Sequence, residues 1–257
     1  GAHADNALDI QEVMVVPVGA DNFSNALRMG AEVFYTLKRL LSEASLSTSV
    51  GDEGGFAPSI GSTEESLGYI TKAIEIAGYS PGQDLMIAID AAASEFCRDS
   101  SYYINGEQQI LGTEDMILMW ENLVSRYPII SIEDPFHEDD WQGFQSLTAS
   151  IGSKIQIVGD DLFATNPQRL ARGIDYAAGN AILIKVNQIG TLSETLRTIK
   201  MAKEAKFGVI ISHRSGETED TIISDFSVAM GMGQIKTGSL SRSDRIAKYN
   251  QLLRIEE

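Results

Sequence analysis

Short, nearly continuous apolar runs alternate along this chain with longer segments in which apolar residues recur at helical spacing. Seven runs have the length and composition of strands, at residues 13–18, 85–89, 129–132, 155–158, 181–184, 207–212 and 234–236. Runs of this kind are typical of strands that are buried on both faces of a parallel sheet. The pattern therefore predicts an α/β fold with a mostly parallel sheet.

The segments between the runs carry the start signals of helices. Ser62, followed three residues later by Glu65, fits a capping box. Asn166 before Pro167 fits an N-cap residue followed by proline at the first helical position. A long amphipathic helix is expected over residues 24–42, and a second helix follows it before the next strand.

A polar side chain that can take part in chemistry follows each apolar run after the first. In chain order these residues are Asp90, Glu133, Asp160, Lys185, His213 and Lys236. Successive members are separated by about one strand, one helix and two loops, so each has the same place in its own repeat. In a (β/α)8 barrel the carboxyl ends of all strands converge on one face, where active sites are built. The spacing therefore predicts three carboxylates, two lysines and a histidine at one barrel mouth.

Each of these residues taken alone has a simpler structural explanation. A single acid after a strand usually caps a helix, and a lysine there usually extends its ammonium to water. Six such residues in phase argue for one site. In contrast, Asp161 is expected to be structural, His137 with residues 138–140 to begin a solvated helix, and Trp120 and Trp141 to pack in the core.

Crowded carboxylates repel one another unless a cation neutralises them. Oxygen ligands favour a hard ion such as Mg2+, and the cysteine and histidines show no zinc-site spacing. Two lysines close to each other and to a divalent cation are expected to have depressed pKa values. A lysine that is neutral near pH 7 can serve as a general base.

Composition narrows the classes of partner. The 257 residues include 36 Asp and Glu against 20 Lys and Arg, for a net charge of −16. Such a chain repels nucleic acid and anionic lipid surfaces. The single cysteine, Cys97, excludes an internal disulfide and suits a reducing compartment. With no apolar run near the roughly 20 residues of a membrane span and no visible signal peptide, we expect a cytoplasmic protein.

Eight segments, in this order, resemble those of the enolase (phosphopyruvate hydratase) family. They are residues 1–6 (GAHADN), 11–20, 50–58 (VGDEGGFAP), 131–141 (SIEDPFHEDDW), 158–167, 183–195, 212–221 and 233–257. The resemblance covers essentially the whole chain and implies a single catalytic domain over residues 1–257, the TIM-type barrel of enolases. That barrel has the order ββαα(βα)6 with one early strand antiparallel, which agrees with two helices before the second apolar run.

The resemblance implies the reversible, Mg2+-dependent dehydration of 2-phospho-D-glycerate to phosphoenolpyruvate in glycolysis and gluconeogenesis. Lys185 matches the base that takes the proton α to the carboxylate, leaving an ene-diolate that two metal ions stabilise. Glu53 matches the general acid that helps the C3 hydroxyl to leave. Three carboxylates match the ligands of the first metal: Asp90, Glu133 and Asp160.

Further positions match the substrate site of the family. Catalytic roles extend to Glu12 and His213, while Arg214 and Ser215 match phosphate contacts and Lys236 matches a lysine beside the substrate carboxylate. The full set of expected substrate-binding residues is His3, Gln11, Glu12, Glu133, Asp160, Arg214, Ser215 and Lys236.

Two family features have no counterpart in this sequence. Enolases carry an N-terminal α+β domain, a loop of which supplies a serine for the second metal, and their first barrel strand precedes the GAHADN motif. We therefore expect a barrel that lacks its first strand and is a weak catalyst alone. The family also implies a homodimer and, if the source is bacterial, a role at the cell surface in binding host proteins.

Two other functions stay open from the sequence. One is a racemase or sugar-acid dehydratase of the wider superfamily, in which the segments at 51–55 (GDEGG) and 212–218 (SHRSGET) are not expected. The other is a non-catalytic, enolase-like binding or structural protein. Such a protein has no chemical need to retain Glu53, Asp90, Glu133, Asp160 and Lys185 together.

Overall fold

The computed structural model describes residues 8–257. The strands within this range are β1 (Glu12–Val16), β2 (Met86–Asp90), β3 (Cys97–Arg98), β4 (Ser101–Ile104), β5 (Gln109–Leu111), β6 (Ile129–Glu133), β7 (Gln156–Gly159), β8 (Ala181–Ile184), β9 (Gly208–Ser212) and β10 (Ile235–Lys236). The helices are α1 (Phe23–Glu43), α2 (Thr63–Ile76), α3 (Thr113–Arg126), α4 (Trp141–Ile151), α5 (Pro167–Tyr176), α6 (Val186–Ile189), α7 (Leu192–Glu204), α8 (Ile222–Ala229) and α9 (Ser243–Glu256).

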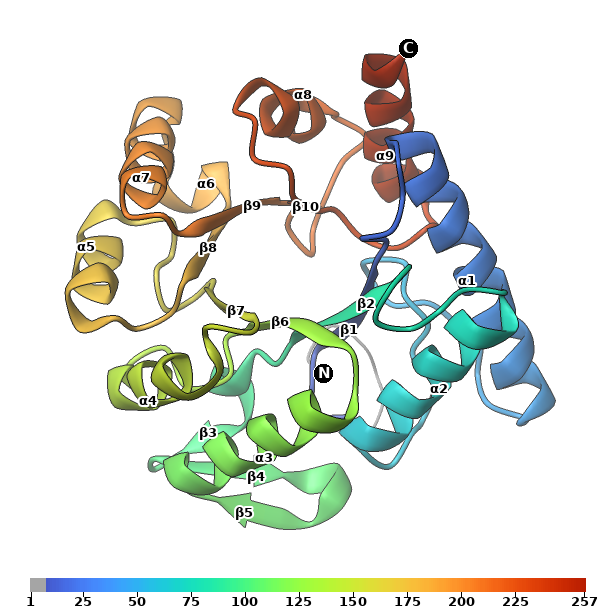
Figure 1. Ribbon diagram of the computed structural model, residues 1–257, viewed down its shortest axis with the longest axis horizontal. Coiled ribbons are helices and arrows are strands. Elements are labelled where there is room, and N and C mark those ends of the chain that lie inside the picture. Colours follow the sequence, from blue (N-terminus) through green and yellow to red (C-terminus); the bar gives the residue numbers. More distant parts are fainter. Residues whose placement is uncertain (1–7) are drawn as a thin grey trace.

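Seven strands form one curled sheet in the order β1-β2-β6-β7-β8-β9-β10, with the helices on its outer side (Figure 1). β1 pairs with β2 in the antiparallel sense, and the remaining pairs are parallel. Within the described residues β1 and β10 are the edge strands of this open barrel. The predicted α/β barrel, its seven strands, the early antiparallel strand and the two helices before β2 are confirmed.

The helix boundaries follow from local chemistry. The Ser62 side chain accepts a hydrogen bond from Glu65 N at 3.1 Å and begins α2. Asn166 likewise accepts from the amides of the first turn of α5, in which Pro167 takes the first position. Gly78 has φ +92°, a conformation that favours glycine, just after α2 ends.

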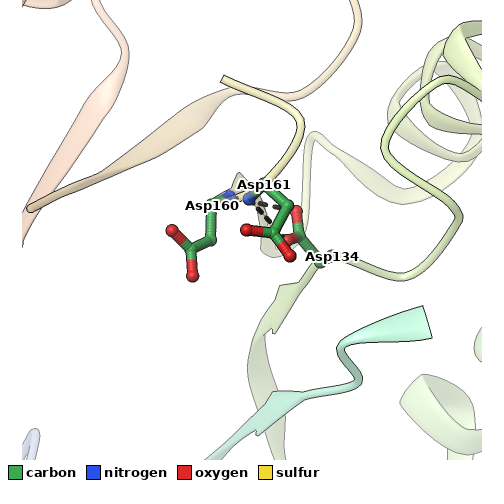
Figure 2. A group of neighbouring side chains, drawn as sticks. All are labelled: Asp134, Asp160 and Asp161. Atoms are coloured by element: carbon green, nitrogen blue, oxygen red, sulfur yellow. Dashed lines mark hydrogen bonds between the residues drawn. The ribbon is translucent and has the colours of Figure 1, made fainter. Parts of the chain in front are cut away.

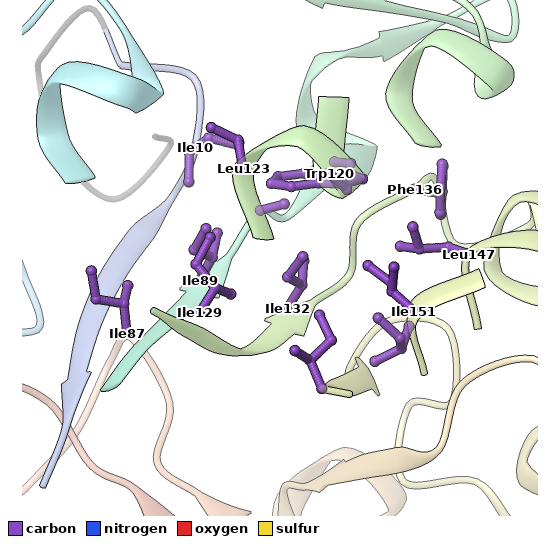
Figure 3. Packing of buried hydrophobic residues seen from close by; sticks show 14 of the residues in the cluster. Ile10, Ile87, Ile89, Trp120, Leu123, Ile129, Ile132, Phe136, Leu147 and Ile151 are labelled. Atoms are coloured by element: carbon purple, nitrogen blue, oxygen red, sulfur yellow. The ribbon is translucent and has the colours of Figure 1, made fainter. Parts of the chain in front are cut away.

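The central strands are largely apolar, as expected for strands that are buried on both faces. In β8, Ile182 and Ile184 belong to the large core between the sheet and the helices. Ala181 and Leu183 point to the other face and belong to a separate cluster with Val158. Figure 3 shows the large core, where α3 places Trp120 beside the strand residues.

A small antiparallel sheet, β3-β4-β5, lies between β2 and α3 and was not predicted. Its strands are two to four residues long, too short to show an alternating pattern. The buried Tyr102 anchors it, because its ring contacts Phe96 and Phe136 and its hydroxyl donates to Asp140 at 2.9 Å. No helix in residues 8–257 has the length and apolar composition needed to cross a membrane.

Candidate active site

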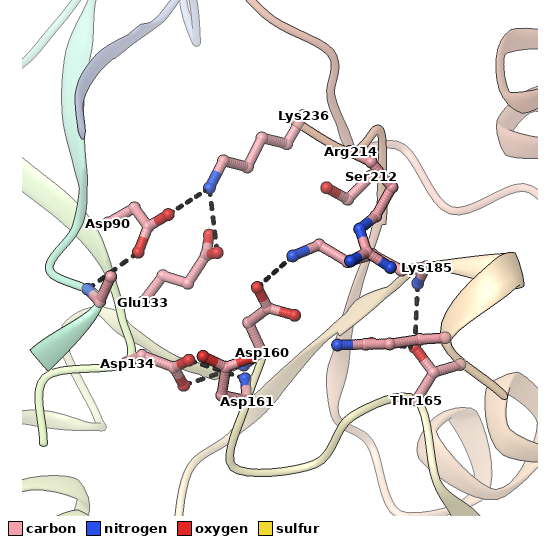
Figure 4. Close-up of polar contacts among 12 residues, drawn as sticks. Asp90, Glu133, Asp134, Asp160, Asp161, Thr165, Lys185, Ser212, Arg214 and Lys236 are labelled. Carbon is pink, nitrogen blue, oxygen red and sulfur yellow. Dashed lines mark hydrogen bonds and ion pairs between the residues drawn. The ribbon is translucent and has the colours of Figure 1, made fainter. Parts of the chain in front are cut away.

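The polar residues predicted at the strand ends come together at the carboxyl end of the barrel (Figure 4). Asp90, Glu133 and Lys236 are the last residues of β2, β6 and β10. The other three directly follow β7, β8 and β9; they are Asp160, Lys185 and His213. Because five of these strands run parallel to β2, their final residues meet at one face.

Lys236 joins the two ends of the curled sheet. Its ammonium donates to Asp90 Oδ2 at 2.7 Å and to Glu133 Oε1 at 3.0 Å. The same nitrogen lies 3.3 Å from Glu12 Oε2 on the edge strand β1. The Lys236 side chain is 10% exposed, so this ion-pair cluster is sheltered from solvent. Three predicted acids therefore already gather around one positive charge.

Gln11, another predicted residue, extends this cluster. Its Nε2 donates to Asp90 Oδ2 at 3.1 Å, and the other Asp90 oxygen accepts from Ala92 N at 3.1 Å. Both oxygens of Asp90 are thus oriented by neighbouring donors. The predicted His3 lies outside the described residues.

Lys185 forms a second ion pair at the mouth, with Asp160. The Lys185 backbone N–H donates to Thr165 Oγ1 at 2.9 Å, which fixes the chain where β8 passes into α6. Asp160 Oδ1 is buried and has no hydrogen-bond partner among residues 8–257. An anionic oxygen in that state is a suitable ligand for a cation.

The pKa values of both lysines differ in direction from the prediction. Burial acts to lower the pKa of Lys185, but Asp160 and Glu133 outweigh it and raise the pKa. Burial likewise opposes a large rise in the pKa of Lys236, which Asp90, Glu12 and Glu133 cause. The predicted depression applies to lysines beside a divalent cation and stays a prediction; among the protein's own groups, the attraction of the carboxylates exceeds the repulsion between the two ammonium groups. Burial and the charge of Asp90 raise the pKa of Glu133 well above its usual value.

Asp134 is a site residue that the sequence analysis missed. Its carboxylate accepts from the backbone N–H groups of Asp160 (3.0 Å) and Asp161 (2.7 Å), as Figure 2 shows. Carboxylate oxygens of these three residues lie within 4.8 Å of one another, and this acidic cluster could hold a metal ion. Burial and the charges of Asp160 and Asp161 raise the pKa of Asp134. The available signal was its position directly after Glu133 at the end of β6.

Glu53 and His213 form a third pair. His213 is 2% exposed, and its Nε2 lies 3.0 Å from Glu53 Oε2. Burial lowers the pKa of His213 to about 3, so the imidazole is neutral at physiological pH. The loop that carries Glu53 is fixed by its backbone, because Glu53 O accepts from Ser239 N at 2.8 Å. At Gly54, where φ is +82°, a Cβ would lie 2.7 Å from Ser241 O.

The two predicted phosphate contacts follow His213 in the same loop. Arg214 is exposed, and its guanidinium donates to Asn187 Oδ1 at 3.2 Å beside Lys185. Ser215 is half-buried. Exposed guanidinium groups of this kind can bind two oxygens of a phosphate at once. The structure therefore brings the predicted residues of the described range to one mouth, with Arg214 and Ser215 at its solvent side.

The curled sheet and the polar mouth define an α/β barrel protein with its site at the carboxyl ends of the strands, where barrel enzymes carry out catalysis. Residues 1–257 match the family described as the enolase C-terminal TIM barrel domain. The chain belongs to this family.

Proposed function

We propose that this protein catalyses the Mg2+-dependent, reversible dehydration of 2-phospho-D-glycerate to phosphoenolpyruvate. Family membership supports an enzyme of the enolase superfamily. The observation that carries the specific reaction is the presence at one mouth of two separate proton-transfer candidates, Lys185 and the Glu53–His213 pair, around an acidic cation site. A dehydration of this type needs one group to remove a proton and another to protonate the leaving hydroxyl.

The acids of the mouth offer oxygen ligands for a magnesium ion, and among the described residues Asp160 belongs, with Asp134 and Asp161, to the cluster whose oxygens lie within 4.8 Å of one another. The proposed ligands are Asp90, Glu133 and Asp160, which offer only carboxylate oxygen, the type of ligand that Mg2+ prefers. Mg2+ held there would supply positive charge that stabilises the negative charge developing on the substrate carboxylate.

Lys185 is the proposed base that takes the substrate proton. Asp160 raises its pKa through a buried ion pair. When the charge of Asp160 is neutralised by another cation, that stabilisation of the ammonium is lost and the amine becomes available to accept a proton. Lys236 also lies 3.3 Å from Glu12, which is not a proposed ligand, and this carboxylate favours the charged ammonium that would bind a substrate carboxylate.

Glu53 is the proposed acid for the leaving hydroxyl, with His213 beside it. The side chain of Glu53 is 13% exposed, so water has limited access to the proton it would carry. Arg214 and Ser215 are the proposed phosphate contacts at the solvent side. The family resemblance also leads us to propose a homodimer in the cytoplasm.

The test is to mix the full chain with 2-phosphoglycerate and Mg2+ and to follow the ultraviolet absorbance of phosphoenolpyruvate. We expect a low rate of product formation, as predicted for this chain alone, which requires Mg2+ and is lost with a chelator and in Lys185→Ala. Lys200→Ala is the matched control, because Lys200 is 77% exposed on α7 and should leave the rate unchanged. Exchange of the C2 proton without any phosphoenolpyruvate would instead indicate a racemase-like reaction.

A further inference from the structure

Arg245 is a fully buried cation that the proposed reaction does not use. It is the third residue of α9, and its side chain is 0% exposed. A buried charge persists only where polar partners satisfy it, so its partners indicate its role.

The guanidinium binds two loops of the mouth at once. One terminal nitrogen donates to His213 Nδ1 and to Arg214 O (2.7 Å). The other donates to Ser215 O (2.6 Å) and to Asp52 O (3.2 Å), the residue before Glu53. Arg245 therefore ties the loop after β9 to the loop that carries Glu53.

The backbone packs closely around this side chain. Gly238 has φ +87°, and a Cβ there would lie 2.6 Å from Arg245 Cδ and 2.9 Å from Glu53 O. Only glycine allows the chain to pass at this distance. The segment that leads from β10 to α9 is thus shaped to fit against both Arg245 and the Glu53 loop.

The contact with His213 has a chemical consequence. An arginine side chain has donors and no acceptor, so the ring nitrogen that faces it must be the unprotonated one. In a neutral imidazole the single proton is then on the other nitrogen, Nε2. That nitrogen lies 3.0 Å from Glu53 Oε2, although it completes no hydrogen bond among residues 8–257.

We infer that Arg245 is a positioning residue that fixes the Nε2–H tautomer of His213 and so keeps an N–H group beside the Glu53 carboxyl group. The tautomer follows from the contacts alone, while its importance for releasing the hydroxyl rests on the proposed function. His213 would hold Glu53 in place without exchanging a proton itself, because burial keeps the imidazole neutral.

The direct test is nitrogen NMR of the protein labelled with 15N-histidine. The sequence has three histidines, so His3→Gln and His137→Gln variants assign the signal of His213. In the wild type we expect a protonated Nε2 and a bare Nδ1. A wild-type His213 protonated on Nδ1, or on both nitrogens at neutral pH, would overturn the inference.

Variants of Arg245 test the cause. In Arg245→Met the Nδ1–H form should appear, because the carbonyls of Arg214 and Ser215 lose their donor and can accept from Nδ1. Lys248→Met is the matched control: Lys248 is also 0% exposed on α9, but it binds Glu217 and Thr218 O farther along the loop after β9, and Asp244 O in its own helix, without touching His213. It should lower stability and leave the tautomer unchanged. An unaltered tautomer in Arg245→Met refutes the inference, and if that variant does not fold, the same comparison is made with Arg245→Gln, whose amide oxygen can accept from Nδ1–H.

Comparing C2-proton exchange with phosphoenolpyruvate formation then separates a positioning role of Arg245 from a general effect on stability. Arg245→Gln should retain exchange of the substrate C2 proton, which depends on Lys185, while phosphoenolpyruvate formation falls by roughly 10²-fold, the lower end for lost acid–base assistance. Equal loss of both activities argues against positioning through His213. If the wild type shows neither activity, the proposed function fails, but the NMR result still decides the tautomer.

Discussion

Replacing Lys236 with methionine removes the cation that holds three acids together across the barrel mouth. Asp90 and Glu133 lie 2.7 and 3.0 Å from its ammonium, and both carboxylate side chains are 4% exposed. Methionine fills a similar volume, so the loss of charge dominates the loss of packing. Removing one partner of a buried ion pair costs about 3–5 kcal/mol, because the other charge stays buried without compensation. For a chain of this size, we expect the melting temperature at pH 8 to fall by on the order of 10 °C.

The loss of stability in Lys236→Met should be larger at high pH than at low pH. Without Lys236, the pKa of Glu133, already raised by burial and Asp90, rises further. The folded state then binds more protons than the unfolded state, so stability falls as the pH increases through this range. Lys236→Met should therefore be closer to the wild type at pH 5 than at pH 8. The variant should also bind Mg2+ more tightly, by at least about tenfold (1.4 kcal/mol), since one repelling cation has gone.

Thermal unfolding at pH 5 and pH 8, with chelator or with Mg2+, measures the stability change, and titration calorimetry measures the affinity. Lys200→Met serves as the control, because its side chain is 77% exposed and substitution there should change stability by less than about 0.5 kcal/mol. The reasoning is refuted if Lys236→Met is as stable as the wild type at pH 8. It is also refuted if the deficit is equal at both pH values and Mg2+ affinity is unchanged.

Three further substitutions test the remaining parts of the site. His213→Gln should lose less stability than the wild type as the pH falls. The pKa of His213 is about 3 in the folded state against a usual 6.5, so below pH 6.5 the unfolded state binds a proton that the folded state does not. The wild type therefore loses about 1.4 kcal/mol of unfolding free energy per pH unit in this window. Urea unfolding between pH 6.5 and about 4.5 checks this, and parallel curves for the two proteins would contradict it. Asp160→Asn should weaken Mg2+ binding measured by calorimetry, and Asp161→Asn, its matched neighbour, should weaken it less; the reverse order would make Asp161 the ligand. Glu53→Gln should preserve exchange of the C2 proton while phosphoenolpyruvate formation falls by roughly 10²–10⁴-fold, and equal loss of both would indicate a positioning role for Glu53.

The strands were predictable because burial on both faces leaves a clear trace in the sequence. The runs that became β2 and β8 are apolar throughout, and the polar residue that ends each run marks the barrel mouth. The structural roles of Trp120 and Trp141 are confirmed, since both are buried in the large core. Asp140 is the N-cap of α4, which agrees with the prediction that a helix begins at residues 137–140.

The parts that were missed depend on contacts between distant segments. Asp134 acts on the backbone of the strand next to its own, and Arg245 joins loops that lie about 30 and 190 residues away in the chain. Periodicity and motif spacing carry no signal for such contacts. The direction of the lysine pKa shifts in the protein alone has a similar origin, because it depends on which carboxylates lie within bonding distance.

The central claim is that Lys185 removes a proton from C2 of 2-phosphoglycerate, and hydrogen-isotope exchange between this carbon and solvent measures that step directly. Exchange should require Mg2+ and should fall by at least roughly 10²-fold in Lys185→Ala, the range expected for loss of a general base. Lys200→Ala should exchange at the wild-type rate. Exchange in Lys185→Ala at the wild-type rate would contradict the account.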